Sequence, residues 1–141
     1  MKKEESSQAI QSHLAIIQNV IQRMSTNSTS SKAWCITLVS AILVIVADKS
    51  KPQYYWLAIL PIILFYLLDS YYLYLEKGFR NSYNTFIEKL HTKELEKEDL
   101  YVVSPTGSFW KRLTKSLMSF STLPFYLTLG LMTWLVKSLA S

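Results

Sequence analysis

Cysteine, glycine and histidine are too scarce in this sequence to build the common catalytic and metal-binding sites. The chain has one cysteine, three glycines and two histidines, which excludes a disulfide framework and a Cys/His metal site. It contains no glycine-rich phosphate loop and no catalytic-triad pattern. We therefore predict that the protein is not an enzyme and uses no cofactor or metal. The two histidines, His13 and His91, are expected to be solvated helix residues.

Charged residues are also few, whereas apolar residues are abundant. Of the 141 residues, 50% are hydrophobic and 13% aromatic, and only 18% are charged, which is typical of an integral membrane protein. The length allows one domain. We expect no cleavable signal peptide, because roughly thirty polar or amphipathic residues precede the first apolar run. These observations predict a single all-α membrane domain.

Three segments are apolar enough to lie in a membrane, namely residues 33–47, 54–75 and 116–136. A span needs roughly 20 residues, so the first segment is too short by itself. The polar run that precedes it, Ser25 to Ser31, contains neither glycine nor proline. We therefore predict one unbroken helix through this run. The predicted units are a long helix with the first span (7–47), a second span with a cytosolic extension (54–100), and an interfacial helix with a third span (109–137).

Basic residues indicate how these spans are oriented. The N-terminal arm carries four of the 15 lysines and arginines, and the stretch from Lys77 to Lys115 carries eight. By the positive-inside rule, both regions face the cytosol. The N-terminus is then cytosolic and the C-terminus outside, in a multi-pass protein of the bacterial inner membrane.

The N-terminal helix has a heptad pattern of apolar residues. Their spacings of 4, 3, 4 and 3 define an a/d seam, formed by Ile10, Leu14, Ile17, Ile21 and Met24. Leucine at a with isoleucine at d favours trimers or tetramers. The alternative is an amphipathic helix that packs on its own chain or lies on the membrane.

The opposite face of this helix carries amides and hydroxyls without charge. A helix facing bulk water normally includes lysine and glutamate, so this face is suited to close helix packing or to a water-filled lumen shared by several copies. Its continuation into the apolar segment predicts a constriction that gates by dewetting. The predicted pore-lining residues are Gln18, Gln22, Ser25, Thr29, Ile36, Val39, Ser40 and Leu43.

Ionisable residues near the cytosolic end of the spans are expected to pair. Equal rise along an antiparallel hairpin places residues whose numbers sum to about 101 at the same depth. Lys32 is then level with Asp69, and Arg23 with Glu76, while Glu76 and Arg80 are an i, i+4 pair. Ionisable groups at membrane depth usually find partners, so we predict that each pair lies close together, within or between subunits. These pairs either fix the hairpin register or take part in gating.

Two stretches of the sequence resemble a known family. The pattern I-Q-x-V-I-x-R-M-x-x-N-S falls on residues 17–28, and L-D-x-Y-Y-L-x-x-E-x-x-F-R-x-x-Y falls on residues 68–83. Together they resemble the SLATT-like proteins (SMODS- and SLOG-associating two-transmembrane effectors), in particular the membrane-channel subunit of the Hailong antiphage system. The resemblance covers about residues 10 to 90 and leaves the C-terminal third without a matching motif.

The resemblance implies a homo-oligomeric ion channel, with a tetramer favoured, that depolarises the membrane in abortive infection. Its implied regulator is the product of a partner nucleotidyltransferase, an oligodeoxyadenylate or another nucleotide, acting from the cytosolic side. The family assigns no binding residues here. From the sequence itself, Lys2, Lys3 and Arg23 are candidate contacts for phosphates.

Two other functions stay open at this level. One is a small proton-coupled multidrug-type transporter with Asp69 as the titrating carboxylate. The other is a membrane scaffold that recruits a partner through its coiled coil. The uncharged polar face favours the channel.

Overall fold

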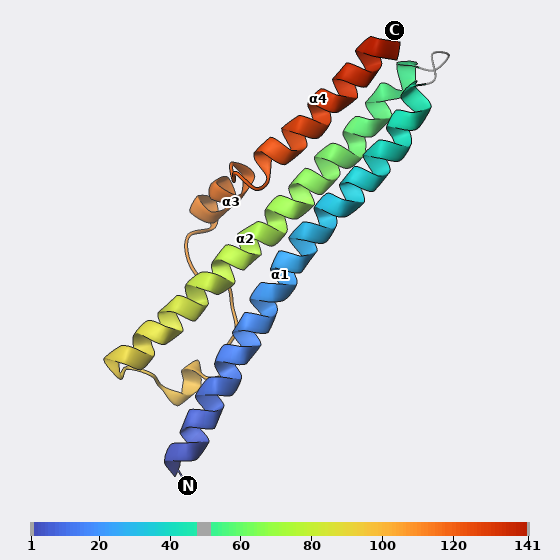
Figure 1. Ribbon diagram of the computed structural model, residues 1–141. Helices are drawn as coiled ribbons and strands as arrows, with labels where there is room; N and C mark the ends of the chain where they lie inside the picture. The colour runs from blue at the N-terminus through green and yellow to red at the C-terminus, as the bar shows by residue number, and fades with distance from the viewer. Residues whose placement is uncertain (1, 48–51, 141) are drawn as a thin grey trace.

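The computed structural model describes residues 2–47 and 52–140, and it describes the backbone alone for 2–6, 52 and 140. In these ranges the chain is helical and contains no strand. The elements are α1 (Lys2–Ala47), η1 (Pro52–Tyr55), α2 (Trp56–Thr92), η2 (Lys97–Asp99), α3 (Phe109–Leu117) and α4 (Leu123–Ala140). Helices α1 and α2 form a long antiparallel hairpin, with α4 along its upper half and α3 packed against α2 (Figure 1).

Helix α1 runs through the polar run without a break, as the absence of glycine and proline predicts. Its hydroxyls turn back onto the helix: Thr29 Oγ1 donates to the Ser25 carbonyl oxygen at 3.2 Å, and Ser31 Oγ donates to that of Asn27 at 2.8 Å. These bonds satisfy the side chains without competing for the helical N–H groups. At 1.5 Å per residue the helix is about 69 Å long, more than twice the hydrocarbon thickness of a bilayer. Its polar half therefore extends beyond any membrane that its apolar half crosses.

Two helices are long and apolar enough to cross a membrane, judged by length and composition: Ser7–Ala47 and Gln53–Thr92. Only 22% of each apolar window is buried within the chain. The core helix of a soluble protein is mostly buried, whereas most of each of these windows is left uncovered by the chain itself. Among the bare side chains are Leu60, Ile63, Leu64 and Leu67 of α2.

The predicted third span is interrupted. Helix α3 ends at Leu117 and α4 begins at Leu123, so residues 118–122 form a turn inside the segment predicted as continuous. Pro124 explains the restart, because proline suits the first turn of a helix, where its missing N–H has no intrahelical partner. The apolar helix that remains, Leu123–Leu139, is shorter than the other two.

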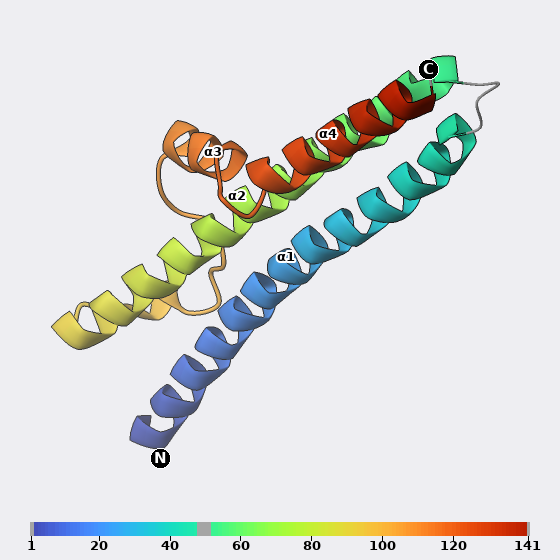
Figure 2. The ribbon, with the colours of Figure 1, turned by 45° about the horizontal axis from the view of Figure 1, so that its top comes forward.

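Helix α2 also ends before the predicted limit of residue 100. Lys93 adopts a left-handed conformation (φ 59°) and its N–H bonds to the Lys89 carbonyl, which caps the helix after Thr92. The following chain turns back toward α1 through η2 (Figure 2). This connection replaces the last two turns of the predicted cytosolic extension.

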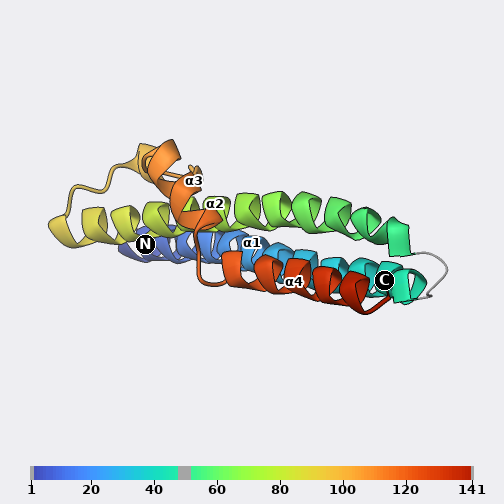
Figure 3. The same cartoon turned by 90° about the horizontal axis from the view of Figure 1, so that it is seen from above.

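The apolar core lies where α1, α2 and α4 meet (Figure 3). Its buried members are Cys35, Val39, Ala58, Ile62, Tyr126 and Leu129. In the polar half of the hairpin, the heptad seam of α1 is used within the chain: Ile17 is fully buried and the other four seam residues are partly buried. The seam of α1 therefore packs, at least at Ile17, on the chain's own helices, as the alternative interpretation of the heptad predicts.

Candidate functional site

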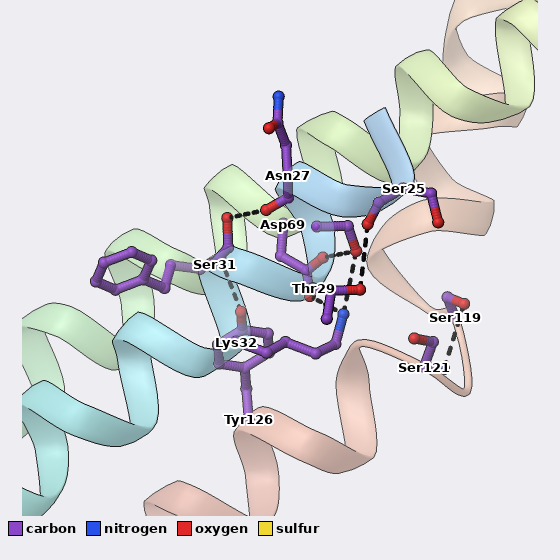
Figure 4. Close-up of polar contacts among 11 residues, drawn as sticks. Ser25, Asn27, Thr29, Ser31, Lys32, Asp69, Ser119, Ser121 and Tyr126 are labelled. Carbon is purple, nitrogen blue, oxygen red and sulfur yellow. Dashed lines mark hydrogen bonds and ion pairs between the residues drawn. The ribbon is translucent and has the colours of Figure 1, made fainter. Parts of the chain in front are cut away.

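A polar cluster is buried in the hairpin where the polar run of α1 meets the apolar part of α2. Asp69 of α2 is its centre, and its side chain has no exposed surface. Ser28 Oγ donates to Asp69 Oδ1 at 2.5 Å, and Lys32 Nζ lies 2.6 Å from Asp69 Oδ2. Lys32 also donates to Ser28 Oγ at 3.2 Å (Figure 4). One carboxylate thus holds two side chains that lie one turn apart on α1.

Helical geometry explains why these three residues meet. Ser28 and Lys32 are spaced i, i+4 and share one face of α1, and equal rise along the hairpin brings that face level with Asp69. The contact between Lys32 and Asp69 that sequence reasoning placed at this depth is present, within one chain. Ser28 was not singled out, although its i, i+4 relation to Lys32 was a signal that could have identified it.

The cluster has a structural consequence. Removing a charge from water costs several kcal/mol, and the opposite charge compensates only where the geometry is good. A register shift of α1 on α2 would leave Asp69 in the apolar core without its partners. The ion pair therefore specifies the register. Tyr126 approaches the same place from α4, where its hydroxyl donates to the Phe65 carbonyl oxygen at 3.1 Å (Figure 4).

The predicted proximity of Arg23 and Glu76 is not present as an ion pair among the described residues. Arg23 is exposed, and Glu76 Oε1 instead accepts from Arg80 Nε at 2.8 Å on its own helix. Equal rise predicts depth but not the direction in which a side chain points, and Arg23 lies off the face of α1 that meets α2. The i, i+4 pair between Glu76 and Arg80 is formed.

The predicted pore-lining residues separate into two groups. Five of them are exposed along one side of α1, Ser25 is partly exposed, and this uncharged stripe continues from the polar half into the apolar half. In contrast, Val39 is buried in the core with Ala58 and Ile62, and Leu43 packs against that core. The packing of α1 on α2 and α4 therefore removes Val39, and in large part Leu43, from the predicted constriction. The exposed members are Gln18, Gln22, Thr29, Ile36 and Ser40.

A polar cleft of about 460 Å³ adjoins this stripe in the cytosol-assigned half of the hairpin. Gln18 spans it, because its Nε2 donates to the Tyr83 hydroxyl at 3.3 Å. Arg23, one of the predicted ligand contacts, is not among the lining residues. The side chains of the other two, Lys2 and Lys3, lie outside the described part of the structure. The cleft is lined by Gln18, Ile21, Gln22, Arg80, Tyr83 and Asn84.

The prediction that both histidines are solvated is wrong for His13. This side chain is buried, its ring centroid is 4.2 Å from that of Phe86, and its Nδ1 accepts the Tyr101 backbone N–H at 2.8 Å. Burial lowers the pKa of His13, and the carboxylate of Asp99 opposes this shift. His91 is exposed. No local pattern marks His13, because its partner lies 88 residues away.

Among the residues that the structure describes, no three His, Cys, Asp or Glu side chains converge where a metal ion could bind. No family model, curated protein or solved structure matches the chain.

Proposed function

We propose that this protein is the subunit of a homo-oligomeric ion channel, in which the exposed polar stripe of α1 lines a lumen shared by several copies. The observation that carries the proposal is the stripe itself. It is uncharged, it continues along one side of an unbroken helix, and the chain's own packing leaves it uncovered.

The surroundings of the stripe support the same arrangement. If the chain were monomeric, the lipid would have to accommodate the hydroxyls on one side of α1. A lumen shared by several copies would supply water to them instead. The exposed leucines and isoleucines of α2 suit contact with lipid. Ile36, which is exposed within the stripe, remains the candidate for a narrow apolar ring that gates by dewetting.

The contacts of Asp69 weigh against the transporter. A carboxylate that carries protons must exchange with water, whereas Asp69 is fully covered and held by Lys32 and Ser28. The hypothesis of a membrane scaffold is also less well supported, because the heptad seam that would recruit a partner packs within the chain.

Regulation, localisation and biological role enter the proposal through the resemblance to SLATT-like effectors. On that basis the channel belongs to the bacterial inner membrane, with its N-terminus in the cytosol, and depolarises the cell in antiphage defence. A nucleotide signal such as oligodeoxyadenylate would act from the cytosolic side. The cleft beside Gln18 offers amides, a tyrosine and Arg80, which are groups that contact bases and phosphates.

Liposome flux combined with cysteine modification tests the lumen directly. In a Cys35→Ala background, single variants Gln22→Cys, Thr29→Cys and Ser40→Cys are reconstituted and treated with a charged, membrane-impermeant thiol reagent. We expect modification to reduce ion flux at each position. Leu64→Cys, on the exposed apolar side of α2, is the matched control and should be unaffected.

Two results would contradict the proposal. One is the absence of passive ion flux under all conditions, with and without a short oligodeoxyadenylate. The other is equal block at Leu64 and at the stripe. Flux that responds to the stripe but not to the oligonucleotide would retain the channel and remove only the proposed regulator.

A further inference from the structure

A strongly basic cavity lies between α2 and α3, on a different part of the surface from the stripe. Its volume is about 510 Å³. Four of its lining side chains are cationic and none is a carboxylate. Such a concentration of one charge is costly unless an anion neutralises it. The lining residues are Lys77, Asn81, Gly107, Ser108, Lys111, Arg112 and Lys115.

Arg112 gives this cavity its most specific feature. The residue is only 8% exposed, and its guanidinium packs on Tyr74, with Cζ 4.4 Å from the ring centroid and Nη2 donating to the hydroxyl at 3.1 Å. Its Nε and Nη1 are buried and have no hydrogen-bond partner. Buried charged donors are rarely left unsatisfied. A guanidinium with unsatisfied N–H groups is a strong charge-assisted donor to phosphate or carboxylate.

The backbone of α2 beside Arg112 leaves room for this guanidinium. A Cβ added at Gly78 would overlap Nη1 of Arg112, so glycine at this place on α2 is what allows Arg112 to lie against the helix. Gly107 has a φ of +100° and a Cβ there would contact Asn81 Nδ2 at 3.0 Å. Both glycines bring backbone close to the cavity.

The other cations are positioned by the same packing. Lys77 Nζ donates to the Lys115 carbonyl oxygen at 2.8 Å, which ties α2 to the end of α3. Burial lowers the pKa of Lys77, the ammonium of Lys115 lowers it further, and Glu76 opposes the shift. The carboxylate of Glu76 is itself paired with Arg80. Ser108 precedes the first turn of α3, whose free N–H groups add to the positive field.

Large exposed apolar side chains in and just after α3 indicate where this part of the molecule lies relative to a membrane. Trp110 is 72% exposed at the start of α3, and Phe120, in the turn that follows, is 92% exposed. Exposed aromatics next to lysine and arginine on a short helix are characteristic of the membrane interface, where phospholipid headgroups lie. Beyond the break between α3 and α4, α4 follows the hairpin, whereas α3 packs against α2 in a different direction (Figure 2).

We propose that the cavity binds a phosphate group, supplied by the headgroup of an anionic phospholipid. The guanidinium of Arg112 supplies the unpartnered donors to the phosphate, and Lys77, Lys111 and Lys115 neutralise the charge. The headgroup is favoured over a soluble phosphate compound because the exposed Trp110 and Phe120 lie in and just after α3, the helix that carries three of the four cations. The proposal does not depend on the channel function.

The test uses the full-length protein in an uncharged detergent, with thermal unfolding measured while lipid or soluble phosphate is added. The probes are phosphatidylglycerol, phosphatidylcholine, inorganic phosphate and deoxyadenosine monophosphate. The site variant is Lys111→Gln/Lys115→Gln, whose positions are exposed on α3. The matched control is Lys93→Gln/Lys97→Gln, which removes the same charge from exposed positions between α2 and η2.

We expect phosphatidylglycerol to raise the melting temperature of the wild type and of the control variant. The apparent affinity of the site variant for this lipid should be lower by a factor of about ten or more, since each charge-assisted contact contributes on this scale. Arg112→Gln should abolish the shift. Its midpoint without lipid reports folding, so loss of binding is distinguished from loss of structure.

Equal stabilisation of site and control variants by phosphatidylglycerol would overturn the proposal, as would equal stabilisation of the wild type by phosphatidylcholine. Stabilisation by the soluble phosphates alone, lost in the site variant, would support the phosphate site and overturn the lipid as its source.

Discussion

Replacing Lys32 by methionine leaves the buried carboxylate of Asp69 without its cation. Methionine fits the aliphatic part of the lysine side chain, so the change removes the charge with little loss of packing. The carboxylate, which has no exposed surface, then keeps its hydrogen bond from Ser28 but has no cation. The variant therefore isolates the contribution of the ion pair.

The structure sets the size of the expected effect. Breaking a buried ion pair by removing one partner costs about 3–5 kcal/mol. The Lys32 side chain is 19% exposed, which places the cost near the lower value, about 3 kcal/mol after allowance for solvent screening. For a domain of this size that corresponds to a fall in melting temperature of about 10 °C.

A double variant makes the reasoning refutable. In Lys32→Met/Asp69→Leu both charges are absent, and a well-packed apolar replacement of a buried pair is often neutral or stabilising. We expect the melting temperature, followed by circular dichroism in detergent, to return to within a few degrees of the wild type, since about 1 kcal/mol corresponds to a few degrees. If the double variant is as unstable as the two single changes combined, the two residues act independently and the reasoning is wrong.

Three other predictions follow from separate contacts. Ser28→Ala should destabilise the fold by about 1.5–3 kcal/mol, the range for a hydrogen bond to a charged group, and a change below 0.5 kcal/mol by the same thermal assay would contradict the role given to the hydroxyl. Burial lowers the pKa of His13 below its usual 6.5, so the unfolded state binds the proton first, and the stability of the fold decreases as pH falls from about 6.5 toward the folded-state pKa. Hydrogen exchange of the Tyr101 amide, corrected for its intrinsic rate, should accelerate in that pH range. Unchanged protection of this amide would refute the prediction. Gly107→Ala, at φ +100°, should cost about 1–3 kcal/mol of backbone strain; Gly130→Ala, where an added Cβ meets no atom within 4 Å, should be neutral or stabilising by up to about 1 kcal/mol, and equal effects would show that backbone conformation is not the cause.

Local sequence rules were sufficient wherever a feature depends on one helix or on the simplest pairing of two. The absence of glycine and proline between Met24 and Lys32 predicts the unbroken α1, because no residue there removes a backbone hydrogen bond or favours another conformation. Equal rise along two antiparallel helices predicts that Lys32 and Asp69 lie at one depth. Both follow from distances along the helix axis, which the residue numbers contain.

Rotation about the helix axis was less well determined. Val39 was assigned to the pore and is in the core, and Arg23 was assigned to Glu76 and is exposed. The heptad shows which side of α1 is apolar but not which helix covers it. Packing of α4 against α1 and α2 widens the buried side of α1. The position of α4 depends on the turn between α3 and α4 near Pro124, which hydropathy does not reveal.

The sequence by itself determined the helical class, the two long apolar helices, the uncharged character of one side of α1, and the depth at which Lys32 meets Asp69. Composition and helical periodicity carry this information because they act within a few turns of the chain. Tertiary structure alone decided that His13 is buried against Phe86 and that Arg112 lies over Gly78 in a cavity of four cations. These contacts join residues between 34 and 73 positions apart, and no local energy specifies them; they form only when the helices pack.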